Sequence, residues 1–415
     1  MPVGMPVYPA FRPYPPVVKR ASTKWIVAAV LTGVAFIVVG FVILAALAVS
    51  NVEEAFRRNA ERDKDDLKVA LEFYGSDAPA CAIAPSNDPD MWAVGYEGLG
   101  TNSGIQVKLD DHIYWAGGWD VNNDALSELL PKASGPARLP NKVIREGPVG
   151  MHFLPDSHAI VFASREMQRV IVLSAAEDPH SSKADFSKVT RFEVMKEKPF
   201  AIALSPDGTK SAVACGEDHD YSDDGITMAN TSAPVLVLWD VTSGKRLATL
   251  EGHKAAVRCV QFMDGETLIS GGNDSTLRIW NLTTGKITDT IEAEAPVTDV
   301  SCAPDRKQIV YCTERGHVIA MDLSTRKRTS LHKDVAEAPT DKSRTYHFVA
   351  ASISPDGKWL AVGDHRLKIY DTESLTLKYE QSRNLDGSIS SMAWNRNSTR
   401  LGTTHGHKAT VWKLP

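Results

Sequence analysis

The feature that most restricts the fold is a unit of about 40 residues that recurs along the chain. Its clearest copy, residues 251–292, reads EGHKAAVRCVQFMDGETLISGGNDSTLRIWNLTTGKITDTIE. Alternating apolar residues indicate short strands with one buried face, and Asp264-Gly265 and Asn273-Asp274 provide tight turns between them. A single four-stranded sheet of this size cannot bury both of its faces, so each copy must pack against other copies.

Other copies are marked by the turn after their first strand and by the end of their third strand. Two turns read Ser-Pro-Asp-Gly, at residues 205–208 and 354–357, and weaker versions lie at 154–157 and 303–306. The third strands close on the pairs Trp239-Asp240, Trp280-Asn281, Met321-Asp322 and Tyr370-Asp371.

The clearest unit closely resembles a WD repeat, with Gly252-His253 at its start and Trp280-Asn281 where that family has Trp-Asp. The resemblance covers about residues 80–415 and implies an all-β fold, a seven-bladed β-propeller of the WD-repeat type. Degenerate units behind an apolar N-terminal segment are similar to bacterial, membrane-anchored WD-repeat proteins. The seven units lie at about 80–140, 143–192, 198–250, 252–292, 297–330, 346–380 and 387–415.

The last unit ends after its third strand, at 409–414, and therefore lacks a fourth. Residues 67–74, LKVALEFY, read as a strand that lies before the first unit. We predict that this strand completes the last blade, because an open blade would leave unpaired backbone groups at a sheet edge. The propeller domain is accordingly expected over residues 67–415.

Residues 25–49 form an uncharged apolar run that is long enough to cross a hydrocarbon core of about 30 Å. We interpret this run as a transmembrane helix and signal anchor, between a Pro-rich disordered tail at 1–24 and a charged stalk at 50–66. A cleaved signal peptide with its site at Ala46-Leu47-Ala48 is the alternative, although the run is longer than the apolar segment of most signal peptides.

Charge favours one orientation and excludes one class of partner. Four basic residues and no acidic ones precede residue 51, which favours a cytoplasmic N-terminus and an extracytoplasmic propeller. Four basic residues that closely follow the span, Arg57, Arg58, Arg62 and Lys64, weaken this preference. The whole chain has a formal net charge of −5, so its acidic excess lies in the globular part. An acidic body argues against nucleic acid as a partner.

Four polar residues of the clearest unit match the family's buried hydrogen-bonded tetrad: His253, Ser270, Asp274 and Trp280. The resemblance implies hydrogen bonds from the Trp N–H to Ser, from Ser to His and from His to Asp. Although Ser, His and Asp also form catalytic triads, no nucleophile elbow accompanies them, and we assign the set a structural role. No catalytic residues are assigned.

An acidic segment, EDHDYSDDG at 217–225, interrupts the third unit between its second and third strands. A solvated acidic loop is the simplest reading, and a partner-binding loop that uses Asp218, Asp220, Tyr221 and Asp224 is a second. Asp220, Ser222 and Asp224 also fit the first half of a calcium loop, but position twelve is Thr231 and not the usual Glu. The expected cofactor is therefore none, with calcium here as the only alternative, and no other metal site is assigned.

The sequence contains no P-loop, HExxH, GxSxG or kinase motif. We expect a non-catalytic, membrane-tethered scaffold whose protein partner is unknown and whose binding face carries the loops around 97–104, 216–232 and 331–345. The alternative is an extracytoplasmic propeller enzyme or small-ligand receptor that acts at the central channel. Clustered carboxylates or histidines with shifted pKa values at the channel would favour the alternative.

Overall fold

The computed structural model describes residues 67–74, 79–97, 104–109, 112–118, 147–155, 159–165, 168–174, 188–191, 195–216, 233–332, 349–381 and 385–414. All of these residues belong to one compact unit, residues 65–415. The expected tail (1–24), transmembrane helix (25–49) and stalk (50–66) lie outside the described residues. In the ranges given above, no helix has the length and hydropathy required to span a membrane.

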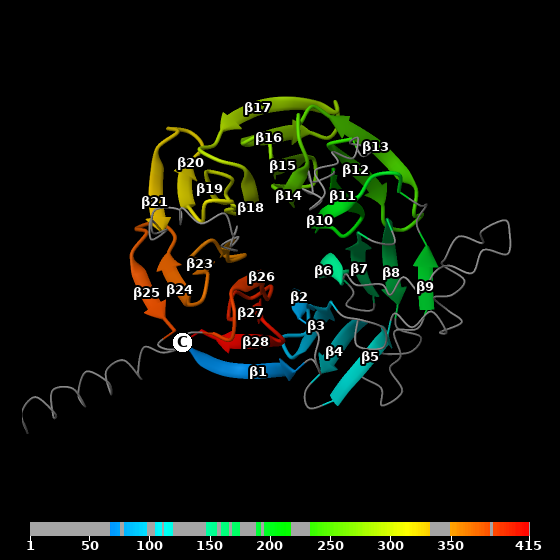
Figure 1. The fold of residues 1–415 in the computed structure, drawn as a ribbon, viewed down its shortest axis with the longest axis vertical. Coiled ribbons are helices and arrows are strands. Elements are labelled where there is room, and N and C mark those ends of the chain that lie inside the picture. The colour runs from blue at the N-terminus through cyan, green and yellow to red at the C-terminus, as the bar shows by residue number, and fades with distance from the viewer. Residues whose placement is uncertain are drawn as a thin grey trace, which may run out of the picture. The chain divides into compact units, whose positions relative to one another are not determined.

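The described residues form seven four-stranded antiparallel sheets that are arranged around a common axis as a propeller (Figure 1). From the innermost strand outward, the first four sheets are β2 (Ala80–Pro85), β3 (Met91–Tyr96), β4 (Gly104–Leu109) and β5 (His112–Gly118); β6 (Pro148–Phe153), β7 (Ala159–Ser164), β8 (Arg169–Ser174) and β9 (Lys188–Arg191); β10 (Pro199–Leu204), β11 (Lys210–Cys215), β12 (Val235–Asp240) and β13 (Arg246–Glu251); and β14 (Val257–Phe262), β15 (Thr267–Gly272), β16 (Thr276–Asn281) and β17 (Lys286–Glu292).

The remaining sheets are β18 (Val297–Cys302), β19 (Gln308–Thr313), β20 (Val318–Asp322) and β21 (Arg328–His332); β22 (Ala350–Ile353), β23 (Trp359–Gly363), β24 (Leu367–Asp371) and β25 (Leu377–Glu380); and β26 (Ile389–Trp394), β27 (Arg400–His405), β28 (Lys408–Lys413) and β1 (Lys68–Tyr74). We call these sheets blades 1 to 7 in this order. The expectation of an all-β, seven-bladed propeller is confirmed.

Burial along each strand follows its radial position. Second strands such as β15 are buried along nearly their whole length, because both faces of the sheet pack against neighbouring blades. The outermost strand β17 alternates between exposed and half-buried residues over most of its length, because it borders solvent. The cores between blades are correspondingly built from both faces of each sheet, as in the cluster that joins Leu236 and Leu238 to Val257 and Leu268.

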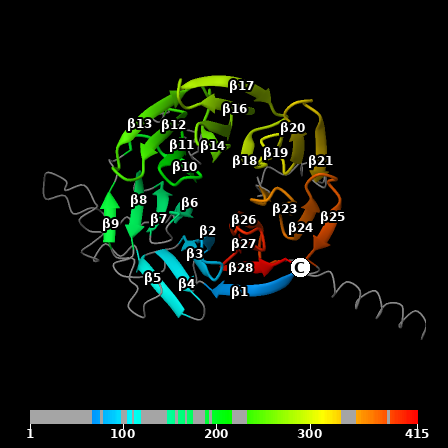
Figure 2. The same ribbon diagram turned by 180° about the vertical axis from the view of Figure 1, so that it is seen from behind.

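The ring is closed by the strand that comes first in the sequence. Strand β1 pairs antiparallel with β28, from Lys68 opposite Lys413 to Tyr74 opposite Lys408. Figure 1 shows the blue β1 along the outer side of the red β28, and Figure 2 shows the same pairing from behind. Blade 7 therefore joins residues from the two ends of residues 67–414, and its outer edge is paired through β1.

Neighbouring blades are joined near the axis by contacts between their innermost strands, which we call the inner belt. Each contact crosses one blade boundary, and most are hydrogen bonds between a side chain and the backbone. Around the ring they are Cys81 Sγ to the Pro148 oxygen (3.3 Å), His152 Nε2 to the Ile202 oxygen (3.0 Å), the Arg258 guanidinium over the Phe200 ring (4.6 Å), the Cys302 N–H to Gln261 Oε1 (2.7 Å), the Ala351 N–H to Asp299 Oδ2 (3.1 Å), Trp394 Nε1 to the Ser352 oxygen (3.0 Å) and Ser390 Oγ to the Ala80 oxygen (3.2 Å).

The two ends of the propeller differ. We call the end at which the innermost strands begin the top face, and the opposite end the bottom face. At the bottom face the turns between first and second strands contact one another from blade to blade. These contacts include Lys210 Nζ to the Gly265 oxygen at 3.3 Å, the Asp356 N–H to Ser398 Oγ at 3.0 Å, and Arg400 Nη1 to the Pro89 oxygen at 2.9 Å.

Candidate functional site

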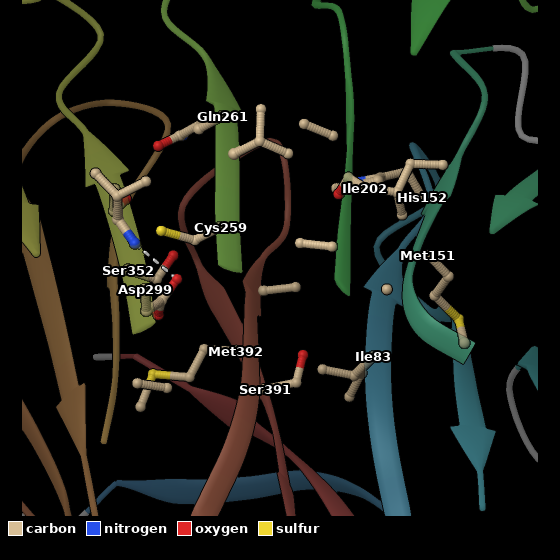
Figure 3. Close-up of a pocket in the computed structure, with 18 of the residues that line it drawn as sticks. Ile83, Met151, His152, Ile202, Cys259, Gln261, Asp299, Ser352, Ser391 and Met392 are labelled. Carbon is tan, nitrogen blue, oxygen red and sulfur yellow. Dashed lines mark hydrogen bonds between the residues drawn. The ribbon is translucent and has the colours of Figure 1, made fainter. Parts of the chain in front are cut away.

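A central cavity of about 1140 Å³ runs along the propeller axis and is lined mainly by the innermost strands of all seven blades (Figure 3). Its wall alternates apolar side chains, such as Met151, Ile202 and Met392, with polar ones, such as Gln261 and Asp299. The innermost strands turn one edge to the axis, because their other edge is hydrogen-bonded to the second strand of the same blade. The cavity is the first candidate site.

Asp299 of β18 is the most strongly perturbed carboxylate of the cavity wall. Burial among the surrounding strands raises its pKa to about 6, although hydrogen bonds from the Ala351 and Val300 N–H groups partly oppose this shift. Both of its oxygens accept a backbone hydrogen bond, at 3.1 and 2.9 Å. The carboxylate therefore joins blade 5 to blade 6.

His152 of β6 is the titratable imidazole of the same wall. Its pKa is lowered by burial, although its hydrogen bond with the Ile202 oxygen acts in the opposite direction. Figure 3 shows His152 and Asp299 on opposite sides of the cavity. Among the described residues, no three His, Cys, Asp or Glu side chains are grouped closely enough to hold a metal ion. The two shifted groups thus connect blades and do not form the cluster that channel chemistry would need.

The structure brings the four tetrad residues of blade 4 together. Trp280 Nε1 donates to Ser270 Oγ at 2.8 Å, and the Ser270 hydroxyl lies 2.8 Å from His253 Nε2. His253 Nδ1 lies 3.0 Å from each oxygen of Asp274. Because an indole N–H can only donate, Ser270 donates to Nε2 and the protonated Nδ1 donates to the carboxylate.

Asp274 ends this chain of hydrogen bonds in a site that stabilises its charge. Burial alone would raise its pKa, but hydrogen bonds from His253, the Lys254 N–H and Thr276 outweigh burial and hold the pKa below its ordinary value. Ser270 is fully buried and His253 is 6% exposed, so a substrate cannot reach the Ser270 hydroxyl. The geometry suits a buried structural network.

The tetrad is local to blade 4. In blade 7, Trp412 Nε1 donates to Thr403 Oγ1 at 2.9 Å, which reproduces only the Trp-to-hydroxyl part. In blade 3, Val213 occupies the place that corresponds to Ser270, as the strand registers show. Blades 3, 5 and 6 share another feature: the Asp at the end of the third strand accepts hydrogen bonds from the residue three positions later, as Asp240 does from Ser243 at 2.7 Å. Asn281 of blade 4 accepts the same hydrogen bonds from Thr284.

The residues expected to contact a partner or calcium lie outside the described residues: Asp218, Asp220, Tyr221, Ser222 and Asp224. The ends of their segment are described, at Gly216 and Ala233, and both lie at the top face, between β11 and β12. The connections β3–β4 and β21–β22 also leave from the top face, and so does the long connection from Gly118 to Gly147 between β5 and β6. Three of these four were singled out from the sequence.

Sequence reasoning missed the cavity residues Asp299 and His152. A signal existed, because each is a polar residue within a short strand pattern, Pro296-Val297-Thr298-Asp299-Val300 in the case of Asp299. Their role depends on a neighbouring blade, however, and the sequence does not state which backbone group faces them. The five cysteines are all free; Cys81 is half-buried and the other four are buried.

Comparison with known proteins agrees with this architecture. The sequence model of the family described as "WD domain, G-beta repeat" matches residues 244–281 and 343–371. The first of these matches contains most of blade 4, including its tetrad Trp280. The chain therefore contains WD repeats, and they form a seven-bladed propeller.

Several eukaryotic proteins are similar to part of the chain. The target of rapamycin complex subunit wat1 of Schizosaccharomyces pombe is 25% identical over 152 residues, which are 36% of this chain and 46% of that protein. Pre-mRNA-processing factor 19 homolog 2 of Arabidopsis thaliana is 28% identical over 211 residues, 48% of this chain and 38% of that protein. Eukaryotic translation initiation factor 3 subunit I of Mycosarcoma maydis is 28% identical over 145 residues, which are 33% of this chain and 42% of that protein.

The chain thus spans less than half the length of each of these relatives. Two of the three are named as subunits of larger complexes, and no name among them denotes a catalytic activity. All three come from eukaryotes, so they give no support to the bacterial type that was expected.

Proposed function

We propose that this chain is a non-catalytic, membrane-tethered scaffold that binds a protein partner on the top face of its propeller. The observation that carries the proposal is the asymmetry between the two faces. Turns between first and second strands at the bottom face are short and contact one another, whereas four long connections leave from the top face. One long connection, between Ser174 of β8 and Lys188 of β9, leaves from the bottom face. Long insertions gathered on one face of a repeat protein are typical of a binding surface.

The relatives support protein binding in a coarse way, because two of them are named as complex subunits. We place the partner contacts on the top-face segments, including the acidic residues Asp218, Asp220 and Asp224 with Tyr221. A calcium ion held by Asp220, Ser222 and Asp224 would be a further element of this loop. Nucleic acid is not proposed as a partner, because the globular part carries the acidic excess.

The tether is the part of the proposal that depends on the sequence alone. Residues 25–49 supply the apolar span, with the N-terminus in the cytoplasm and the propeller on the other side of the membrane. Protease treatment of intact cells tests this arrangement. The propeller should be digested without permeabilisation, and protection of the propeller until the cells are opened would reverse the orientation.

The alternative of an enzyme or receptor at the channel has less support. Asp299 and His152 line the cavity, but each is bonded to the backbone of a neighbouring blade: Asp299 accepts a hydrogen bond from the Ala351 N–H, and His152 Nε2 donates one to the Ile202 oxygen. The pKa values of both groups are shifted by burial between blades, and the backbone hydrogen bonds oppose these shifts.

Site-directed photocrosslinking tests the binding face. A photoreactive residue is placed at exposed top-face positions, Lys254 and Arg315, and at the exposed bottom-face positions Lys307 and Arg396 as matched controls. The full-length chain should crosslink one common protein from the top positions and not from the bottom positions. Equal crosslinking from both faces, or unrelated products at each top position, would contradict the proposal.

A further inference from the structure

Asp299 is a carboxylate of the cavity wall that no positive charge balances. Among the described residues it forms no ion pair, and its only hydrogen bonds come from the neutral N–H groups of Ala351 and Val300, at 3.1 and 2.9 Å. Burial raises its pKa to about 6, and no basic side chain acts in the opposite direction. The group is therefore mostly ionised at pH 7, without a counter-ion from the described part of the chain.

The titratable groups close to Asp299 do not supply the missing positive charge. The thiols of Cys259 on β14 and Cys312 on β19 have pKa values that are raised by burial and by the charge of Asp299, so both thiols stay neutral. His152 lies on the opposite side of the cavity (Figure 3), and its lowered pKa keeps it neutral at pH 7 as well. Asp299 is thus the one ionised group of this set.

Two further charged side chains line the cavity, Arg258 and Glu314. Arg258 is the second residue of β14 and lies over the Phe200 ring, and Glu314 directly follows β19, so both lie toward the top face. The raised pKa of Asp299 is caused by burial and not by either of them. Because their opposite charges cancel, the cavity wall carries one net negative charge at pH 7, that of Asp299.

The space beside Asp299 suits an ammonium group. Asp299 is half-buried, and each of its oxygens accepts one hydrogen bond although a carboxylate oxygen can accept two. The half-buried Ser352 lies on the same side of the cavity (Figure 3), and its hydroxyl forms no hydrogen bond within the described residues. An ammonium group has three N–H donors and can therefore bond to both side chains.

The rest of the wall suits the apolar part of a small molecule. Met392 lies on the side of Asp299, and Met151 and Ile202 lie on the opposite side (Figure 3). The cavity volume of about 1140 Å³ is large enough for a whole small molecule, since such sites measure about 300–1,000 Å³. A single side chain that reached in from a protein partner would fill only part of this volume.

We propose that the central cavity binds a small organic molecule through an ammonium group that pairs with Asp299. This site goes beyond the proposed function, because it lies inside the ring of blades and not on the top-face connections. One carboxylate suffices to bind a cation, although it would not suffice for catalysis. The bound ammonium would also offset the unfavourable effect of an unpaired, partly buried charge on the stability of the fold.

Isothermal titration calorimetry with the full-length chain in detergent tests this site. The probe is n-butylammonium chloride at pH 7.5, and n-butanol is its neutral counterpart of the same length. Asp299→Asn should weaken binding of n-butylammonium by at least about tenfold, because the amide carries no charge. Glu314→Gln removes the same charge from an exposed position of the cavity wall and is the matched control, which should change the affinity by less than about twofold.

Two further measurements separate binding from folding. The affinity of the unchanged protein should fall by about tenfold from pH 7.5 to pH 5, because Asp299 becomes protonated, and Asp299→Asn should lose this pH dependence. Ser352→Ala keeps the charge and should weaken binding by about threefold. Each variant must first melt no lower than the unchanged protein, and the pH series on the unchanged protein provides the answer if a variant fails to fold.

The proposal is overturned if n-butanol binds as tightly as n-butylammonium, or if Asp299→Asn binds like the unchanged protein. It is also overturned if an equal concentration of potassium ions displaces n-butylammonium, because the site would then be a general cation site. Tighter binding of the tripeptide Gly-Lys-Gly would overturn the small-molecule assignment, since the ammonium group would then come from a protein side chain. None of these outcomes changes the photocrosslinking result, which tests the scaffold separately.

Discussion

Buried polar residues change the free energy of unfolding of this propeller in opposite directions, depending on whether they have a hydrogen-bond partner. The tetrad of blade 4 gives every buried polar atom of its chain a partner, from Trp280 Nε1 to the Asp274 carboxylate. Ser211 of the neighbouring blade is equally buried, yet its hydroxyl has no hydrogen-bond partner. Because an unsatisfied buried polar group is costly, similar serines in adjacent blades should respond differently to removal of the hydroxyl.

We expect Ser270→Ala to lower the free energy of unfolding by about 2–4 kcal/mol, since the Trp280 N–H and His253 Nε2 both lose their partner. Ser211→Ala, the matched control, should be neutral or should stabilise the protein by up to about 1 kcal/mol. Urea denaturation of both variants measures the difference. Equal losses would mean that the network contributes nothing beyond the packing of a small side chain.

Asp299 makes the stability of the propeller fall as the pH rises, whereas a carboxylate with a lowered pKa makes stability rise with pH. Its pKa of about 6 lies above the ordinary value of 3.8, so the group favours the folded state below about pH 4 and this contribution is lost between about pH 4 and 6. Asp299→Asn should therefore match the unchanged protein near pH 4 and exceed its stability at pH 7.5 by about 1–3 kcal/mol. Denaturation at both pH values checks this, and a difference independent of pH would refute it.

At the scale of elements, the turns between first and second strands determine how blades meet. The fourth position of these turns has a left-handed backbone, with φ of +73° at Gly208 and +76° at Gly357. Arg306 and Ser398 adopt the same conformation, with φ of 59° and 57°, although they carry side chains. The Ser398 hydroxyl uses this position to accept the Asp356 N–H of the adjacent blade. The turns therefore act both within a blade and between blades.

Gly208→Ala should destabilise the protein by about 1–3 kcal/mol for two reasons. Its backbone is left-handed, and a Cβ atom would lie 2.3 Å from Cδ of Pro155 in blade 2. Gly265→Ala is the control in the corresponding turn of blade 4, where a Cβ atom would meet nothing within 4 Å. Thermal melting compares the two, and a similar shift for both would show that the contact with Pro155 has no energetic role.

At the scale of the whole molecule, closure depends on contacts that are far apart in the sequence. The inner belt joins each blade to the next, and β1 pairs with β28 across more than 300 residues of chain. Without β1, the backbone groups of β28 would form an exposed edge that can pair with another molecule. Ring closure thus protects the propeller from association as well as from unfolding.

Deletion of residues 1–74 should lower the melting temperature by at least about 5 °C and cause association in size-exclusion chromatography. Deletion of residues 1–64 removes everything before the compact unit and leaves β1 in place, so it is the matched control. Two truncated proteins with the same melting temperature and the same elution volume would show that β1 is dispensable for closure.

Much of this fold could be predicted because its determinants are local. Alternating apolar residues specify strands, and Pro-Asp-Gly segments such as 205–208 specify the turns that join them. These signals repeat often enough to indicate the propeller and its number of blades. The tetrad residues could be named because one unit, blade 4, retains the His, Ser, Asp and Trp of the WD pattern.

The contacts that line the central cavity join residues of different blades, and the sequence does not show which residues meet there. Which blades lie next to each other follows from radial packing, and packing places Arg165, Phe200 and Arg258 on one ring although 93 positions separate the first from the last. In the same way, Asp299 acquires its high pKa from a neighbouring blade whose backbone it contacts. By itself the sequence determined strands, turns and their repetition, since these depend on neighbours along the chain. Tertiary structure alone decided the contacts between blades, because burial and charge there depend on neighbours in space.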